Sequence, residues 1–287
     1  MHLENNKLSI DTKSMGAELT SIKYNGREFL WNADKKYWGR HSPILFPIVG
    51  RFKDNVAIIE GKEFSMGQHG FARDSEFKEV FKSDNKVTYL LTYDDETLKM
   101  YPYKFELYIS YEILANKVKV TYEVKNVDNK NIFFSIGGHP AFNWPICEGE
   151  TFEDYYIEFD QKETQKFIRV DGGCLCYEDN LIIEDTDRID LNKSKFNIDT
   201  FVFKNLNSKK ATLKSKKSNF SVSVYFEGFP YLGIWSKENE APFICVEPWC
   251  GVADFTNHNK IFKEKEGIIE LGVGEKFERS YVIEIND

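Results

Sequence analysis

Residues 105–126 read FELYISYEILANKVKVTYEVKN, and apolar and polar side chains alternate through almost all of them. The alternation covers Phe105–Ile113 and resumes over Val118–Val124. A period of two is typical of a β-strand that buries one face. The two runs therefore predict an antiparallel hairpin that turns at Asn116-Lys117.

The same alternation recurs along the chain, and no window of a dozen residues has a helical period. An Asn25-Gly26 pair, the strongest short hairpin signal, joins residues 19–24 to residues 27–31. Many short strands separated by turns predict an all-β fold, a large antiparallel β-sandwich of many strands with few short helices. We expect residues 1–287 to form a single domain. Further alternating runs are Val87–Tyr93, Phe220–Phe226 and Phe277–Ile285.

Composition excludes several classes of protein. The 287 residues carry 46 acidic and 38 basic side chains, a net charge of −8, which argues against a nucleic-acid partner. No apolar run approaches the roughly 18 residues of a membrane helix, and the first residues do not resemble a signal peptide. The five cysteines never form a C-x-x-C pair, so we expect reduced thiols, no metal site and a cytoplasmic protein.

Four segments break the alternation and collect glycine, proline and polar side chains. Three of the five histidines, His41, His69 and His139, lie in the first three of them. Glycine and proline fix an irregular backbone and allow a ligand to approach closely. Such segments on a rigid β scaffold are where a binding site is expected. The four segments are residues 38–55, 66–74, 136–145 and 246–254.

These segments resemble, in the same order, the motifs of the aldose 1-epimerase (galactose mutarotase) family, and most closely its LacX-like branch. The matching stretches are residues 43–54, 69–73, 137–144 and 247–254, which include His-Gly-Phe-Ala-Arg, Gly-Gly-His-Pro-Ala-Phe and Glu-Pro-Trp. The resemblance runs nearly end to end. It implies a galactose mutarotase-like β-sandwich, a small-molecule sugar substrate, and catalysis with no metal and no cofactor.

The resemblance also assigns roles by position. His139 would be the general acid, Glu247 the general base, and His69 a second histidine that contacts the sugar. Arg51 resembles the family's substrate-binding arginine. Asp199 resembles the aspartate that holds sugar hydroxyls, but Asp187 competes for that role and the choice stays open.

The implied reaction interconverts the α and β anomers of a free hexose by acid–base ring opening. A base removes the proton of the anomeric hydroxyl while an acid protonates the ring oxygen. A histidine with its ordinary pKa of about 6.5 can protonate the ring oxygen, and an ionised glutamate can deprotonate the hydroxyl. Phe71, Phe142 or Trp144 could offer the sugar an apolar face.

Two alternatives remain from the sequence. Arg73 could bind a phosphate, as in hexose-6-phosphate 1-epimerases, although Arg40 lies one position away from that branch's other arginine. A non-catalytic sugar-binding protein on the same fold is the second alternative, because a fold does not determine a function. His41 could line the site or cap a loop. Whether the chain forms a homodimer is left open.

Overall fold

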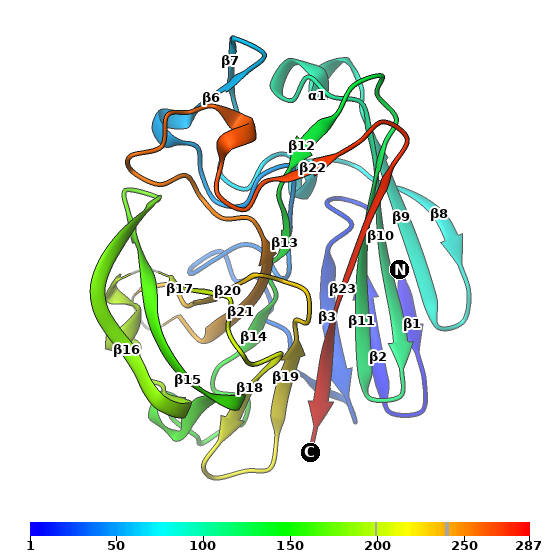
Figure 1. Ribbon diagram of the computed structural model, residues 1–287. Helices are drawn as coiled ribbons and strands as arrows, with labels where there is room; N and C mark the ends of the chain where they lie inside the picture. The colour runs from blue at the N-terminus through cyan, green and yellow to red at the C-terminus, as the bar shows by residue number, and fades with distance from the viewer. Residues whose placement is uncertain (199, 239–240) are drawn as a thin grey trace.

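The structure is a computed structural model that describes residues 1–198, 200–238 and 241–287. Those residues form mainly β-strands, which Figure 1 shows as packed layers. The strands are β1 (His2–Glu4), β2 (Leu8–Thr12), β3 (Leu19–Tyr24), β4 (Arg27–Glu28), β5 (Ile44–Leu45), β6 (Val56–Ile59), β7 (Lys62–Ser65), β8 (Lys78–Lys82), β9 (Lys86–Thr92), β10 (Phe105–Leu114), β11 (Lys117–Asn126), β12 (Ile132–Phe134), β13 (Ile136–Gly138), β14 (Ala141–Asn143), β15 (Tyr155–Asp171), β16 (Cys174–Asp190), β17 (Phe201–Lys204), β18 (Lys210–Ser215), β19 (Ser221–Tyr225), β20 (Tyr231–Trp235), β21 (Phe243–Cys250), β22 (Ile269–Leu271) and β23 (Lys276–Asn286).

Helices are short. The α-helix α1 (Asp95–Met100) has six residues and is capped by Asp94, whose side chain accepts a hydrogen bond from the Thr97 amide. The described residues hold no helix with the length and apolar character needed to cross a membrane. The 3₁₀ turns are η1 (Lys53–Asn55), η2 (Ala72–Asp74), η3 (Phe152–Asp154), η4 (Lys193–Ile198) and η5 (Phe262–Glu264).

The largest sheet has fifteen strands and is antiparallel throughout. Its main path runs β5-β13-β21-β20-β17-β15-β18-β19-β23-β11-β10-β9-β8, with β14 paired to β21 and β16 paired to β15. Strands far apart in sequence, such as β13 and β21, therefore become neighbours. This is the all-β architecture that the alternating sequence predicts.

The β10–β11 hairpin confirms the prediction from residues 105–126, with a correction to its turn. Leu107 pairs with Val124, and Leu114 pairs with Lys117, so the two turn residues are Ala115 and Asn116. The predicted turn, Asn116-Lys117, is one residue too late. Alternation determines which face is buried but does not locate the turn, whose first residue here takes a φ of 57°.

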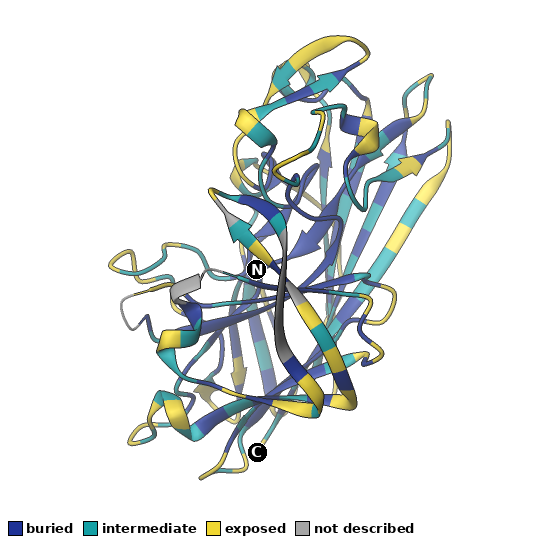
Figure 2. Ribbon diagram, turned by 60° about the vertical axis from the view of Figure 1, so that its left-hand side comes forward, coloured by how far each residue is buried: buried dark blue, intermediate teal, exposed yellow. Residues whose placement is uncertain are grey.

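A second sheet, β1-β2-β3-β4, packs against the first and completes the sandwich. The Thr12 and Tyr89 hydroxyls lie 2.8 Å apart across the interface, and the Tyr111 hydroxyl donates to the Ala17 carbonyl at 2.7 Å. The Asn25-Gly26 turn joins β3 to β4 as predicted. Figure 2 shows buried residues alternating along the long strands and exposed residues gathered in the connecting loops.

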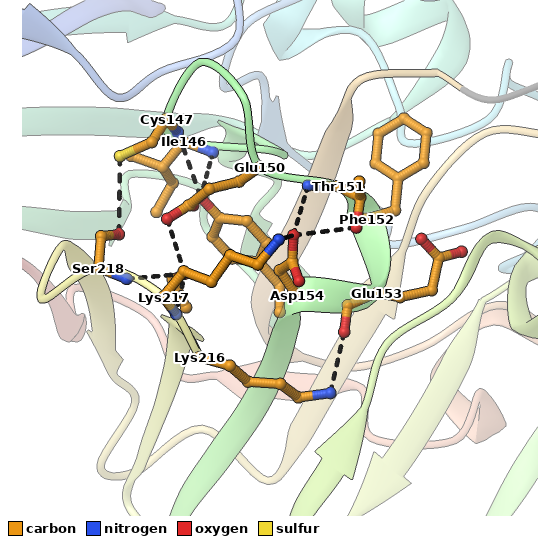
Figure 3. Close-up of polar contacts among 12 residues, drawn as sticks. Ile146, Cys147, Glu150, Thr151, Phe152, Glu153, Asp154, Lys216, Lys217 and Ser218 are labelled. Carbon is orange, nitrogen blue, oxygen red and sulfur yellow. Dashed lines mark hydrogen bonds and ion pairs between the residues drawn. The ribbon is translucent and has the colours of Figure 1, made fainter.

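The loop between β14 and β15 is fixed by polar contacts (Figure 3). The Tyr155 hydroxyl accepts hydrogen bonds from the amides of Ile146 and Cys147 at 2.8 and 3.2 Å. The Cys147 sulfur lies 3.6 Å from the Ser218 hydroxyl, in the turn between β18 and β19. These contacts hold the loop that follows β14, the strand directly after His139.

Candidate active site

The irregular segments converge on a cavity of about 340 Å³. Each of the four segments singled out in the sequence contributes to its wall, and strands β15–β17 and β20 close the rest. Figure 1 shows β13, β20 and β21, which carry or flank several of these residues, together at the centre of the molecule. The lining residues are Trp38, Val49, Gly50, Gln68, His69, Arg73, His139, Val170, Gly173, Leu175, Thr200, Val202, Trp235, Lys237, Glu247, Trp249 and Ala253.

His139 and Glu247 meet at this cavity. Nε2 of His139 lies 3.3 Å from Oε2 of Glu247, and the two side chains are only 9% and 1% exposed. Glu247 sits within β21 opposite Gly233 of β20, while His139 follows β13 and its amide donates to the Pro43 carbonyl at 3.2 Å. The pairing of β13 with β21 thus brings the predicted acid and base together.

The two glycines before His139 allow this approach. A Cβ on Gly137 would lie 2.5 Å from Cδ1 of Trp249. A Cβ on Gly138 would lie 2.8 and 2.9 Å from the hydroxyls of Tyr122 and Tyr281. Real side chains do not tolerate such distances, so β13 fits between these aromatic residues only because both positions lack a Cβ.

His69 is held by two hydrogen bonds to one residue. The Gly50 amide donates to Nδ1 of His69 at 3.0 Å, and the His69 amide donates to the Gly50 carbonyl at 2.7 Å. The residue has a φ of 67°, an uncommon left-handed conformation that clusters at functional sites. Because Nδ1 accepts, the neutral ring carries its proton on Nε2 and offers that proton as a donor.

Aromatic rings enclose His139. Trp38 stacks on its ring at 4.8 Å, and Trp235 meets it edge-on at 5.5 Å. The three aromatic residues that the sequence suggested as a face for the sugar do not belong to the described cavity wall: Phe71, Phe142 and Trp144. Phe142 and Trp144 are fully buried in the core. Trp235 was missed because β20 reads Tyr-Leu-Gly-Ile-Trp, an apolar strand with no charged or histidine side chain to mark it as part of a site.

Burial keeps both histidines of the site neutral. Burial, reinforced by the charge of Arg73, lowers the pKa of His139 to about 3. Burial also lowers the pKa of His69 well below 6.5, and His139 and Arg73 add to the effect. The ordinary histidine pKa expected from the sequence is therefore wrong for His139.

We expect His139 not to titrate between pH 5 and 8, because its pKa lies near 3, and His69 to titrate only well below pH 6.5. Exposed His2, whose pKa is raised chiefly by a hydrogen bond with Asp11, is the internal control and should titrate above pH 6.5. Histidine ring signals in a heteronuclear NMR pH series test this. A His139 signal that titrates near pH 6.5 would contradict the account.

The same shift makes folding stability depend on pH. Below pH 6.5 the unfolded chain protonates His139 and the folded chain does not, so stability falls as the pH falls. Between pH 7 and 5 the expected loss from His139 alone is about 2 kcal/mol. Urea unfolding of the wild type and of His139→Asn at both pH values isolates this contribution. Equal losses in the two proteins would show that His139 does not cause it.

Arg73 contributes a partly buried positive charge to the cavity wall. One Nη donates to the Gln68 carbonyl at 2.6 Å, and Nε lies 3.6 Å from Asp74. Burial and neighbouring Arg40 lower its pKa to about 10, so it stays charged at neutral pH. Arg40 itself pairs with both carboxylate oxygens of Asp74, at 2.9 and 3.2 Å, and is not part of the described wall. Lys237, which the sequence did not single out, adds a second cation.

Arg51 lies beside the cavity rather than on its described wall. Its Cδ and Nε lie 3.3 Å from the place where Gly173 would carry a Cβ. Arg51 instead lines a neighbouring cavity of about 280 Å³ with Cys174 and Thr256. Gly173, at the tip of the β15–β16 hairpin, thus stands between the arginine and the main cavity.

The structure describes only one of the two aspartates that were candidates for holding the sugar hydroxyls. Asp187 is exposed on β16 and does not belong to the described wall of either cavity. Asp199 lies outside the described residues, although the next residue, Thr200, lines the main cavity.

His41 helps to fix a loop. Its amide donates to Oε1 of buried Glu18 at 2.8 Å, and the Ser42 amide donates to the same oxygen at 3.1 Å. Burial by itself would raise the pKa of Glu18, but hydrogen bonds from His41 and Lys13 outweigh it and lower the pKa to about 2. This ionised carboxylate anchors the start of the first irregular segment. His41 therefore caps a loop rather than lining the described cavity wall.

One further side chain lies beside His139 and Glu247. Sγ of Cys245, a nitrogen of His139 and a carboxylate oxygen of Glu247 all lie within 4.8 Å of one another. The signal in the sequence was the i, i+2 spacing of Cys245 and Glu247, which puts both on one face of a strand. This group combines the donor atoms of a metal site.

Comparison with known proteins agrees with the geometry. The family model for aldose 1-epimerase matches residues 1–260. The LacX protein of Lactococcus lactis subsp. lactis is 35% identical over 295 residues, which cover 99% of each chain. A galactose mutarotase related enzyme from Lactobacillus acidophilus superposes with a TM-score of 0.95 at 33% identity, covering 100% of this chain and 97% of that one. A galactose mutarotase-like protein from Lactobacillus casei superposes with a TM-score of 0.92 at 32% identity, covering 100% of this chain and 99% of that one. The chain belongs to the aldose 1-epimerase family, in its LacX-like branch.

Proposed function

We propose that this protein is a mutarotase that interconverts the α and β anomers of a free hexose, with Glu247 as the general base and His139 as the general acid. The observation that carries the proposal is the 3.3 Å approach of these two buried side chains at the wall of a sugar-sized cavity. A protein that only binds sugar has no use for an acid–base pair.

Ring opening moves one proton from the anomeric hydroxyl to the ring oxygen. His139 first takes up a proton from solvent and becomes an imidazolium. Glu247 then takes the hydroxyl proton, the imidazolium gives a proton to the ring oxygen, and the bond between the anomeric carbon and that oxygen breaks to leave the aldehyde and a neutral imidazole. Rotation about the next carbon–carbon bond and reversal of the steps form the other anomer. The pair returns to its starting state, so nothing is consumed.

The charges around His139 decide how readily it becomes the acid. Burial and Arg73 disfavour the imidazolium, whereas the Glu247 carboxylate 3.3 Å away favours it. Because burial and the charge of Arg73 destabilise the imidazolium, the imidazolium is a strong acid and gives up its proton readily. Glu247 thus supports the acid step as well as acting as the base.

The remaining polar groups suit the binding of hydroxyls. His69 offers Nε2–H, and Arg73 and Lys237 offer charged donors to an uncharged sugar. Arg51 and Asp199 are proposed as further contacts to the hydroxyls. Trp38 and Trp235 contribute apolar surface to the wall, against which a sugar ring can pack.

A hexose 6-phosphate is the second candidate substrate, and one observation favours it. Arg73 and Lys237 line the same cavity, and both can bind a phosphate. The pairing of Arg40 with Asp74 removes one further cation from that role. We therefore rank the free sugar first.

Exchange NMR between anomers distinguishes the two substrates. With wild-type protein we expect faster exchange for glucose and galactose than in buffer, and no preference for glucose 6-phosphate. Arg73→Gln is expected to raise KM for the free sugar by roughly tenfold, the value of a lost charged hydrogen bond, with kcat changed little. Acceleration confined to glucose 6-phosphate, and lost in Arg73→Gln, would make the phosphate sugar the substrate instead.

A further inference from the structure

We propose that the floor of the cavity binds a thiophilic divalent cation, Zn²⁺ or Cd²⁺, through His139, Cys245 and Glu247, and that the bound cation inhibits the enzyme. The inhibition rests on the proposed function, whereas the binding does not.

The three donor atoms are close enough for one cation. They lie within 4.8 Å of one another. A point therefore exists that is at most about 2.8 Å from each atom, since that limit is 4.8 Å divided by √3, and zinc bonds of about 2.0–2.3 Å require side-chain shifts of roughly half an ångström to 0.8 Å. The 3.3 Å between Nε2 of His139 and Oε2 of Glu247 already matches the separation of two ligands in a tetrahedral zinc site.

The fold places these side chains together without distortion. Cys245 and Glu247 are alternate residues of β21 and share a face of that strand. Ala141, two residues after His139, pairs directly with Cys245 across the β14–β21 ladder. The Cys245 side chain is fully buried beneath the two residues that line the cavity. A cation would enter from the cavity and keep a water molecule as its fourth ligand.

The chemistry of the donor set selects the cation. One imidazole nitrogen, one sulfur and one carboxylate oxygen suit Zn²⁺ or Cd²⁺, whereas Mg²⁺ and Ca²⁺ prefer oxygen alone. Burial raises the pKa of the Cys245 side chain, so it is a thiol before a cation binds. On binding, the metal–sulfur bond replaces the sulfur–hydrogen bond and the proton leaves to solvent.

A bound cation would block proton transfer. It would occupy the nitrogen of His139 and the oxygen of Glu247 that the proposed reaction uses. Cys245 has no part in that reaction, so its replacement should remove the inhibition while leaving the basal rate in place. This separation makes Cys245 the residue to change.

The test compares Cys245→Ser with Cys147→Ser. Cys147 lies in the β14–β15 loop (Figure 3) and does not belong to the described cavity wall. Mutarotation is measured against increasing Cd²⁺, with Mg²⁺ as the hard-cation control. We expect Cd²⁺ to inhibit the wild type and Cys147→Ser alike, and Cys245→Ser to need at least about tenfold more Cd²⁺, as expected for a lost ligand. Mg²⁺ should have no effect. Equal inhibition of wild type and Cys245→Ser would overturn the proposal.

A second readout does not depend on activity. A cadmium–thiolate bond gives an ultraviolet charge-transfer band, which should appear in the wild type, persist in Cys147→Ser and be lost in Cys245→Ser. Cys245→Ala, which adds no hydroxyl to the buried position, repeats the test if the serine variant does not fold. Absence of any band that depends on Cys245 would overturn the site. A Cys245-dependent band in a protein without mutarotase activity would support the site and refute only the proposed function.

Discussion

Replacing Glu247 with glutamine is expected to lower kcat for mutarotation of a free hexose by roughly 10³–10⁴-fold, the upper part of the range for a lost general base. Glutamine keeps the shape and the hydrogen-bonding capacity of the side chain but cannot take a proton. The loss should exceed that of a simple base because Glu247 is also the negative charge 3.3 Å from His139. Polarimetry on freshly dissolved α-galactose measures the rate.

The matched control for this variant is Glu112→Gln, which removes a carboxylate from the less buried face of β10. It should keep the wild-type rate. Circular dichroism and thermal melting of Glu247→Gln should show an intact fold, since an isosteric neutral side chain replaces a buried one. A Glu247→Gln protein that retains near-wild-type mutarotation would refute its assignment as the base.

Replacing His139 with asparagine is expected to lower kcat by roughly 10²–10³-fold, the loss for a general acid whose partner base remains. KM should change less, because the other polar groups of the wall still contact the sugar. The aromatic slot formed by Trp38 and Trp235 is left partly empty, so some loss of stability is expected as well. Rates are compared at equal concentrations of folded protein.

His2→Asn is the control here, because His2 is exposed and its ring contacts only Asp11 and Glu4 among the described ion pairs. That variant should behave as wild type. If His139→Asn lowers affinity for sugar but leaves the rate at saturation unchanged, His139 binds the substrate and the acid must be sought elsewhere on the wall, with His69 the first residue to change.

The strand architecture could be predicted from the sequence because alternation reports burial directly. Residues 105–126 form the hairpin expected, and the Asn25-Gly26 turn falls where its residue types require. The predicted turn of the β10–β11 hairpin was one residue too late. Alternation with a period of two does not identify a turn residue in the left-handed conformation, such as Ala115. That residues 1–287 form one domain stays a prediction.

The candidate site was predicted in part. Four of the candidate residues line one cavity: His69, His139, Arg73 and Glu247. They could be singled out from the sequence because glycine and proline mark their segments as irregular. Trp235 and Lys237 were not singled out, because they lie at and just after the end of β20, which reads as an ordinary apolar strand. Their place on the wall depends on the pairing of β20 with β21. The local sequence pattern does not predict which strands pair over a long range.

The measurement that tests the central claim most directly is the rate of optical-rotation change of α-galactose and α-glucose at several concentrations of wild-type protein. The account predicts a first-order rate that rises in proportion to the protein concentration and falls to the buffer rate with Glu247→Gln. Rotation that relaxes at the buffer rate at every concentration, while calorimetry shows that the sugar binds, would contradict it and identify a sugar-binding protein on this fold.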